Sequence, residues 1–207
     1  MAMQADKRSN LERQDWINAA YQVLIEEGVH QVRILNLADR LGISRGSFYW
    51  HFKNRADLLD ALISTWQQKN TGALVAACRR DTDFTGRMLA IADCWVYETH
   101  YDPALDAAMR SWAQYDAAVY QVVQAEDRKR LAAFQRLFRE HGFTSQQAMI
   151  RARVFYFTQV GYFALGVKET ESVEQRLALY RDYFLVFTGE PLDEARLQQH
   201  LNTPPSA

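Results

Sequence analysis

The sequence has little proline, glycine and cysteine, and each shortage excludes a class of structure. Four prolines and nine glycines among 207 residues leave long stretches without a helix breaker. The two cysteines, Cys78 and Cys94, fit neither a disulfide framework nor the spacing of a zinc site, so we expect small buried side chains in a reducing compartment. No apolar run approaches the roughly 18 residues that a membrane helix needs, and residues 1–10 lack the apolar core of a signal peptide. We therefore predict a cytoplasmic protein.

The chain also lacks a strong net charge. It holds 24 Lys and Arg residues against 25 Asp and Glu residues, so total charge does not indicate a nucleic-acid partner. Residues 1–55, however, carry 8 basic against 6 acidic side chains, whereas the remainder carries 16 against 19. The amino-terminal part therefore suits phosphate better than the rest does. None of the five histidines pairs at ligand spacing, and no glycine-rich loop suits a nucleotide, so we expect neither a metal nor a cofactor.

Helical periodicity accounts for most of the chain, and no stretch alternates as a strand would. Apolar residues make up 48% of the sequence, which is enough for a substantial core. Good capping residues stand where helices are expected to begin, at Asn54, Asp83, Thr144 and Ser172. No proline interrupts residues 54–80, which predicts one rigid connecting helix. The expected helices span residues 11–27, 34–41, 45–52, 54–80, 83–99, 103–115, 119–140, 144–166, 172–189 and 193–201.

Residues 34–52 combine two short helical patterns around a turn. In the first pattern apolar residues recur at intervals of three and four, and the small Ala38 suits a close helix crossing. Gly42 can end this helix in the left-handed conformation, and the Ser44 hydroxyl can cap the next one. In the second pattern Phe48 is placed to pack against the first. The remaining residues are not expected to be buried and stay on the surface: Arg45, Gly46, Ser47, Tyr49, Trp50 and His51. This pattern is typical of a helix-turn-helix, whose second helix can enter a DNA major groove.

Two other interpretations of this stretch have less support. An ordinary helical hairpin of an all-α core would not crowd arginine, tyrosine, tryptophan and histidine on one helix. Residues 42–46 also match the G-x-S-x-G motif of serine hydrolases, but that motif needs a strand leading into the serine, and here a helix leads in. We therefore do not expect an enzyme.

Residues 37–55, LADRLGISRGSFYWHFKNR, resemble the signature of the TetR family of bacterial transcriptional regulators. The likeness covers roughly residues 13–66. Two positions depart from the family pattern, because Arg33 replaces the usual capping Thr or Ser and Arg55 replaces the usual Lys. The resemblance implies an all-α fold, with a three-helix helix-turn-helix head (residues 1–55) joined by a long helix to a helical ligand-binding and dimerisation body (residues 56–207).

The predicted DNA contacts divide by chemistry. Helices that enter the major groove contact bases mainly with their first turns, so we assign base edges to Arg45 and Ser47, with Trp50 and His51 as further candidates. Tyr49, Lys53 and Arg55 are assigned to phosphates, as the resemblance also implies. The full predicted DNA-binding set is Arg33, Arg45, Gly46, Ser47, Tyr49, Trp50, His51, Lys53 and Arg55.

The carboxy-terminal body is rich in large aromatic residues and methionine. Any one of these side chains can simply belong to the core, but a cavity of about 300 Å³ or more with a few polar groups would bind an apolar ligand. The resemblance implies an inducer pocket in this body, and the sequence does not identify the ligand. The predicted ligand-binding set is Trp66, Met88, Trp95, Thr99, Tyr101, Met109, Trp112, Phe155, Gln159 and Tyr162.

The last two long helices carry apolar residues on more than one face, and Gly161, Ala164 and Gly166 would allow close approach. The resemblance implies that these helices pair with a second copy. We predict a homodimeric, ligand-responsive regulator, a repressor that releases a pseudo-palindromic DNA operator when a small, largely apolar molecule binds the body. Two rival interpretations stay open, namely a regulator whose body responds to a protein or to nothing, and a helical enzyme with an incidental head.

Overall fold

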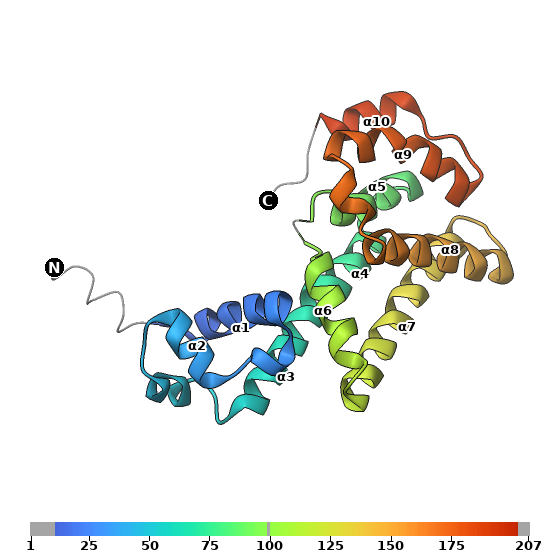
Figure 1. Cartoon of the computed structure of the whole chain (residues 1–207). Helices are drawn as coiled ribbons and strands as arrows, with labels where there is room; N and C mark the ends of the chain where they lie inside the picture. The colour runs from blue at the N-terminus through green and yellow to red at the C-terminus, as the bar shows by residue number, and fades with distance from the viewer. Residues whose placement is uncertain (1–10, 99, 203–207) are drawn as a thin grey trace. The chain divides into compact units, whose positions relative to one another are not determined.

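The computed structural model describes residues 11–98 and 100–202 (Figure 1). Within these ranges every regular element is a helix and none is a strand, which confirms the predicted all-α class. No helix in the described ranges is long and apolar enough to cross a membrane. The chain divides into two compact units: the first comprises the chain up to Gln68 with Ala104–Val123, and the second comprises Lys69–Pro103 with the chain from Gln124 onward. The predicted domain boundary after residue 55, between a DNA-binding head and a ligand-binding body, stays a prediction.

The first unit packs five short helical elements against a helix from much later in the chain. Its core is lined by buried Trp16, Leu37 and Phe48 from the amino-terminal helices and by Leu105 and Met109 from the later one. The elements are α1 (Arg13–Glu27), η2 (Val29–Gln31), α2 (Ile34–Leu41), η3 (Arg45–Trp50), α3 (Arg55–Trp66), α6 (Pro103–Ala113) and the beginning of α7 (Ala117–Glu140).

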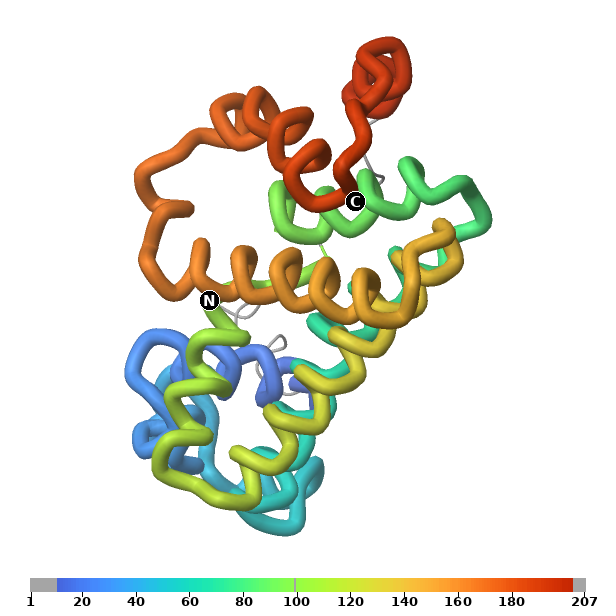
Figure 2. The backbone as a smooth tube through the Cα atoms, turned by 90° about the vertical axis from the view of Figure 1, so that its right-hand side faces the viewer, coloured from blue at the N-terminus to red at the C-terminus, as the bar shows by residue number. Residues whose placement is uncertain are grey.

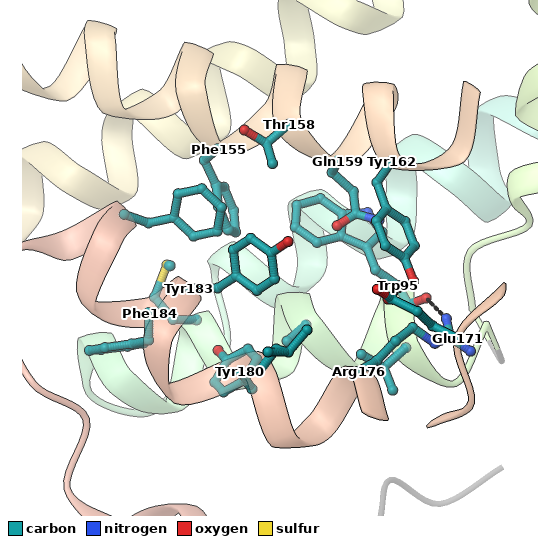
Figure 3. A pocket seen from close by; sticks show the side chains of 15 residues that line it. Trp95, Phe155, Thr158, Gln159, Tyr162, Glu171, Arg176, Tyr180, Tyr183 and Phe184 are labelled. Carbon is teal, nitrogen blue, oxygen red and sulfur yellow. Dashed lines mark hydrogen bonds between the residues drawn. The ribbon is translucent and has the colours of Figure 1, made fainter. Parts of the chain in front are cut away.

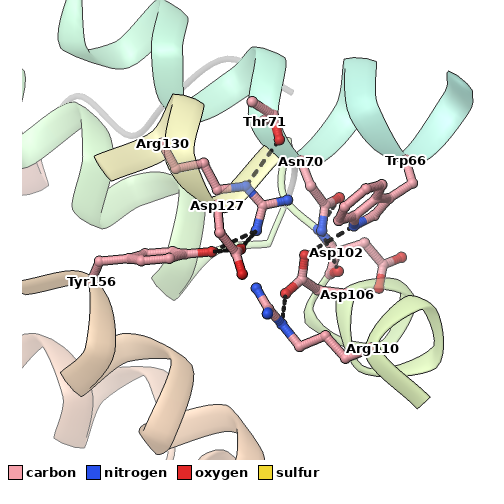
Figure 4. Close-up of polar contacts among 9 residues, drawn as sticks. All are labelled: Trp66, Asn70, Thr71, Asp102, Asp106, Arg110, Asp127, Arg130 and Tyr156. Carbon is pink, nitrogen blue, oxygen red and sulfur yellow. Dashed lines mark hydrogen bonds and ion pairs between the residues drawn. The ribbon is translucent and has the colours of Figure 1, made fainter. Parts of the chain in front are cut away.

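A polar contact fastens α6 to α3 inside this unit. The Trp66 indole N–H donates to Asp106 Oδ1 at 2.9 Å, and Arg110 Nε donates to Asp106 Oδ2 at 2.8 Å (Figure 4). Because the indole nitrogen and the carboxylate are both buried, each supplies the partner that the other needs. Trp66 is therefore a core residue of the first unit and is committed to Asp106.

The second unit contains the remaining helices around an aromatic core. Rings from α5, α7 and α8 meet there, with Phe134 and Phe155 at 5.2 Å and Trp95 and Phe155 at 4.9 Å between centroids. Helices α8 and α9 run alongside each other in this unit (Figure 2). Its elements are part of η4 (Gln67–Gly72), α4 (Ala73–Cys78), α5 (Phe84–Val96), the rest of α7, α8 (Ser145–Ala164), η5 (Val167–Thr170), α9 (Val173–Thr188) and α10 (Glu194–Leu201).

The capping residues begin their helices as expected. Side-chain oxygens of Asn54, Asp83, Thr144 and Ser172 each accept a hydrogen bond from the backbone N–H three residues later. Such a bond is local and satisfies a donor that the first turn of a helix leaves free. Four helix starts were therefore predictable from the sequence.

The connecting helix predicted over residues 54–80 is helical without a break from Arg55 to Cys78, but its middle segment is π-helical rather than α-helical. The π-helical segment η4 separates α3 from α4. Within the second unit, Asn70 Nδ2 donates to the Asp102 carbonyl at 2.8 Å, and Asp102 N donates to Asn70 Oδ1 at 3.2 Å. Asparagine and threonine are weak helix formers, and here their buried polar groups bind residues outside the helix.

The neighbouring Thr71 joins a buried network around Arg130. Arg130 Nε donates to Thr71 Oγ1 at 2.9 Å and Nη1 donates to the Tyr156 hydroxyl at 2.9 Å, which in turn donates to Asp127 Oδ1 at 2.6 Å (Figure 4). The guanidinium is fully buried, so these bonds offset part of its cost of leaving water. The network joins η4, α7 and α8 within the second unit.

Candidate nucleic-acid interface and apolar pocket

A tight corner joins α2 to η3. Gly42 adopts the left-handed conformation, with φ 68° and ψ 34°, and ends α2 as expected. Ile43 N then donates to the Ala38 carbonyl at 3.0 Å, which closes the turn. A residue with a Cβ would be strained at this φ, so glycine permits the corner.

The element after the corner differs from the expected helix. Residues Arg45–Trp50 form a 3₁₀ helix, and the Ser44 hydroxyl makes no capping hydrogen bond. The backbone supplies the first contact instead, because Ser47 N donates to the Ser44 carbonyl at 3.1 Å. A 3₁₀ helix turns more tightly than an α-helix, which brings side chains three positions apart into line.

Phe48 anchors this short helix to the core. Its ring is completely buried and contacts Trp16 at 5.2 Å and Phe52 at 5.3 Å between centroids. With Phe48 turned inward, the next two aromatic residues face outward: Tyr49 is 59% exposed and Trp50 is 87% exposed. An aromatic residue that exposed gains little from folding, so its place on the surface suits a binding role.

The other predicted DNA-binding residues lie on η3 or within five residues of its end, except Arg33, which precedes α2. Arg33, Arg45, Gly46 and Lys53 are exposed, whereas Ser47, His51 and Arg55 are half-buried. Arg33 begins α2 without a side-chain cap, and its Nε donates to the His30 carbonyl at 2.9 Å.

The amino-terminal end of α3 lies directly after this segment. Asn54 Oδ1 accepts from Asp57 N at 3.0 Å, and Asp57 Oδ2 accepts from Lys53 N at 3.0 Å. These two bonds fix the backbone around Lys53, whose side chain remains exposed. A fixed backbone beside a helix amino terminus favours an anion such as a phosphate.

Arg55 donates hydrogen bonds within the first unit. Its Nε donates to the Val32 carbonyl at 2.5 Å and its Nη2 donates to the Val29 carbonyl at 2.6 Å. The guanidinium therefore braces η2 and the approach to α2 from inside the unit. Two of its donors are therefore engaged within the first unit, and a phosphate contact of Arg55 stays a prediction.

A partly enclosed pocket lies in the second unit between α5, α8 and α9 (Figure 3). Five predicted ligand-binding residues line it: Met88, Trp95, Phe155, Gln159 and Tyr162. Its cavity volume is about 80 Å³, well below the expected 300 Å³. A ligand larger than a single ring would therefore have to displace lining side chains.

The remaining predicted pocket residues lie elsewhere. Trp66, Met109 and Trp112 belong to the core of the first unit. Tyr101 is buried in the second unit and stacks on Phe163 at 5.9 Å between centroids. Thr99 lies outside the described residues. Periodic aromatic residues thus identified buried positions without distinguishing a pocket wall from a core.

Sequence reasoning missed the contribution of α9 to the pocket. The lining from α9 recurs at intervals of three and four, and a charged residue stands in this otherwise aromatic and aliphatic stripe. That charge within an apolar face was the available signal. The missed residues include Arg176, Leu179, Tyr180, Tyr183, Phe184 and Phe187, together with Glu171 just before the helix.

One end of the pocket is polar. The Tyr162 hydroxyl donates to Glu171 Oε2 at 2.7 Å. Burial and this neighbouring carboxylate both raise the pKa of Tyr162 above its ordinary value, so the hydroxyl remains a donor even at the pH where an exposed tyrosine ionises.

Apolar side chains also project outward from α8 and α9. Phe157 is 56% exposed and Val186 is 69% exposed. Apart from its chain neighbours and the backbone of its own helix, no heavy atom lies within 4 Å of the position that a Cβ would take at Gly161. Gly166 adopts φ 68° directly after α8, so glycine at this position permits the turn. We call this exposed set the apolar strip: Ile150, Val154, Phe157, Leu179, Tyr183 and Val186.

The amino-terminal part of the chain matches a known family. Residues 17–62 match the family model described as "Bacterial regulatory proteins, tetR family". This stretch is similar to the DNA-binding part of the TetR family. The tetracycline repressor protein class C of Escherichia coli is 41% identical to it over 54 residues, which are 26% of this chain and 25% of that repressor. The match thus spans about a quarter of that relative's length.

Solved structures extend the likeness to the rest of the fold. The ketosteroid transcriptional regulator KstR2 of Mycobacterium tuberculosis superposes with a TM-score of 0.65 at 15% identity, over 89% of this chain and 97% of that one. The SmeT–triclosan complex superposes with a TM-score of 0.62 at 22% identity, over 88% of this chain and 99% of that one. At these identities the likeness shows that this chain shares their fold.

Proposed function

We propose that this chain is a DNA-binding transcriptional repressor of the TetR family that a small ligand releases from its operator. The observation that carries the proposal is the outward face of η3, where Arg45, Tyr49 and Trp50 project around the buried Phe48. A cation and two aromatic side chains on a braced corner can contact bases and phosphates without further folding.

The contacts in this proposal follow the exposure of each side chain. Arg45 and Ser47 stand in the first turn of η3 and contact base edges, with Trp50 and His51 next to them. Tyr49 and Lys53 contact phosphates, aided by the amino terminus of α3. Arg33 supplies a further exposed cation, and Gly46 lets the backbone approach the groove.

The ligand and dimer parts of the proposal rest on the second unit. The pocket supplies an apolar site, and the apolar strip supplies a surface through which two copies pair. SmeT, which shares the fold, is described in complex with triclosan. Two paired copies would present two η3 helices to the half-sites of a pseudo-palindromic operator in the cytoplasm.

In this mechanism the ligand acts through differential binding. A molecule that separates the pocket walls favours one conformation of the second unit, and affinity for DNA falls only if that conformation binds the operator less well. Helix α7 contributes residues to both compact units, so a displacement of this helix would involve each of them.

The proposal is tested by selecting bound duplexes from a random DNA library with the full-length chain. A recovered palindrome then serves in fluorescence anisotropy titrations over a range of salt concentrations. Lys53→Ala and Tyr49→Phe should weaken binding to every duplex, and Lys53→Ala should reduce the slope of log affinity against log salt by about 0.9. Arg139→Ala, which removes an exposed cation of the second unit, is the matched control and should change neither quantity. Failure to enrich any duplex at low salt contradicts the proposal.

A further inference from the structure

The pocket of the second unit has two chemically distinct ends (Figure 3). Phe155 and Phe184 lie at one end, whereas Gln159, Glu171 and Arg176 lie toward the other. Such a division suits a ligand with an apolar body and one polar group. The charges at the polar end that already have partners limit the chemical class of that polar group.

Both acidic side chains near the polar end have one oxygen engaged at short distance, while Glu98 Oε1 is buried without a hydrogen-bond partner among the described residues. Glu171 Oε2 accepts the Tyr162 hydroxyl at 2.7 Å, and Glu98 Oε2 pairs with Lys168 Nζ at 2.6 Å. A ligand that brought a positive charge would meet the Lys168 ammonium group beside Glu98. It would also meet the positive charge of Arg176.

Arg176 is held much more loosely. Its side chain is only 12% exposed, yet its Nη1 lies 3.5 Å from both the Trp95 carbonyl and Glu98 Oε1. Its Nε is buried and has no hydrogen-bond partner among the described residues. Glu98, the nearest anion, is shared with Lys168.

A buried guanidinium with an unmatched N–H costs free energy that a suitable acceptor recovers. Arg176 is the one cation among the described residues that line the pocket. A carboxylate matches a guanidinium in charge and geometry and forms stronger hydrogen bonds with it than a neutral acceptor does. The geometry therefore favours an anionic acceptor next to Arg176.

We propose that the ligand of this pocket is a small aromatic or aliphatic monocarboxylate whose acid group binds Arg176. The inference rests on the proposed ligand site and specifies its chemistry. The apolar body lies among Trp95, Phe155 and Phe184, and the Gln159 amide, which also lines the pocket, can donate to the second carboxylate oxygen. The cavity volume of about 80 Å³ restricts the body to about one ring unless the lining moves.

Isothermal titration calorimetry on the full-length chain tests this with three probes that share one apolar body. These are 4-ethylbenzoate, the neutral 4-ethylbenzamide and the cationic 4-ethylbenzylamine. Because the three share their apolar body, their affinities report on the polar group alone. The acid should bind at least tenfold more tightly than either of the others.

Variants of α9 connect this preference to one side chain. Arg176→Gln should bind the acid and the amide within twofold of each other, and Arg176→Lys should retain part of the preference because it keeps the charge. Arg181→Gln is the matched control, since Arg181 lies on the same helix but is exposed and pairs with Glu194. It should keep the wild-type ratio.

Equal affinities of the wild type for acid and amide, tighter binding of the amine, or no binding of the acid would each overturn the inference. If Arg176→Gln does not fold, the wild-type ratio and Arg176→Lys decide. Operator binding by the same samples without probe is measured in parallel. Intact operator binding with no preference for the acid rejects this ligand class alone, whereas loss of operator binding rejects the proposed function.

Discussion

Replacing Arg55 should separate a positioning role from a phosphate contact. The Arg55 guanidinium donates to the Val32 and Val29 carbonyls at 2.5 and 2.6 Å and is half-buried. Hydrogen bonds from a charged donor contribute roughly 1.5–3 kcal/mol each, and partial exposure favours the lower end of that range. Arg55→Met keeps the aliphatic stem and removes both bonds. We expect the free energy of unfolding to fall by about 2–4 kcal/mol.

The assay pairs urea denaturation with the salt dependence of operator binding. If Arg55 only positions η2 and α2, Arg55→Met should leave the slope of log affinity against log salt unchanged once measured on folded protein. Lys53→Met is the complementary control, because Lys53 is exposed next to the same helix. It should reduce the slope by about 0.9 and change stability by less than about 0.5 kcal/mol. An Arg55→Met protein of normal stability with a reduced slope would refute the reasoning and support the phosphate contact.

Three further predictions concern the corner, the apolar strip and the thiols. Gly42→Ala should destabilise the chain by about 1–2 kcal/mol in chemical denaturation, because φ is 68° there; an unchanged midpoint would contradict the turn. Phe157→Glu should shift the protein from dimer to monomer in light scattering, whereas Tyr115→Glu, at an exposed position of the first unit, should not. Burial raises the pKa of Cys78 to about 12 and that of Cys94 to about 11. Thiols in the unfolded chain ionise near pH 8.5, so the contribution of the two neutral buried thiols to the free energy of unfolding is full below that pH. It should decline as the pH rises toward 11–12. A free energy of unfolding that stays constant over this range in alkaline denaturation would contradict the burial.

Local chemistry explains which parts of the fold were predictable. Asp83 and Thr144 each bond to the backbone three residues away, so a short stretch of sequence contains all the information about the cap. The corner at Gly42 follows from glycine's freedom in the left-handed region in the same way. The tight 3₁₀ form of η3 was not predictable, since six residues carry too little periodicity to distinguish it from an α-helix.

Long-range packing explains the parts that were missed. Trp95 and Trp112 are both aromatic, buried and helically spaced, yet Trp95 lines the pocket and Trp112 fills the core of the first unit. Their difference depends on which helices meet, and the hydrogen bond between Trp66 and Asp106 joins α3 to α6 across a sequence separation of 40. Arg55 shows the same limit, because its two carbonyl partners are more than 20 residues away.

Helix α9 links the two proposed activities of the second unit. Leu179 and Tyr183 line the pocket, and the same two side chains belong to the apolar strip, with Tyr183 stacked on the pocket residue Phe187 at 5.7 Å between centroids. A cavity of about 80 Å³ cannot enlarge without moving some of its wall. Movement of α9 would reshape the strip at Leu179 and Tyr183. Under the proposed function, ligand affinity and dimer stability are therefore thermodynamically linked, and each must change the other by the same factor.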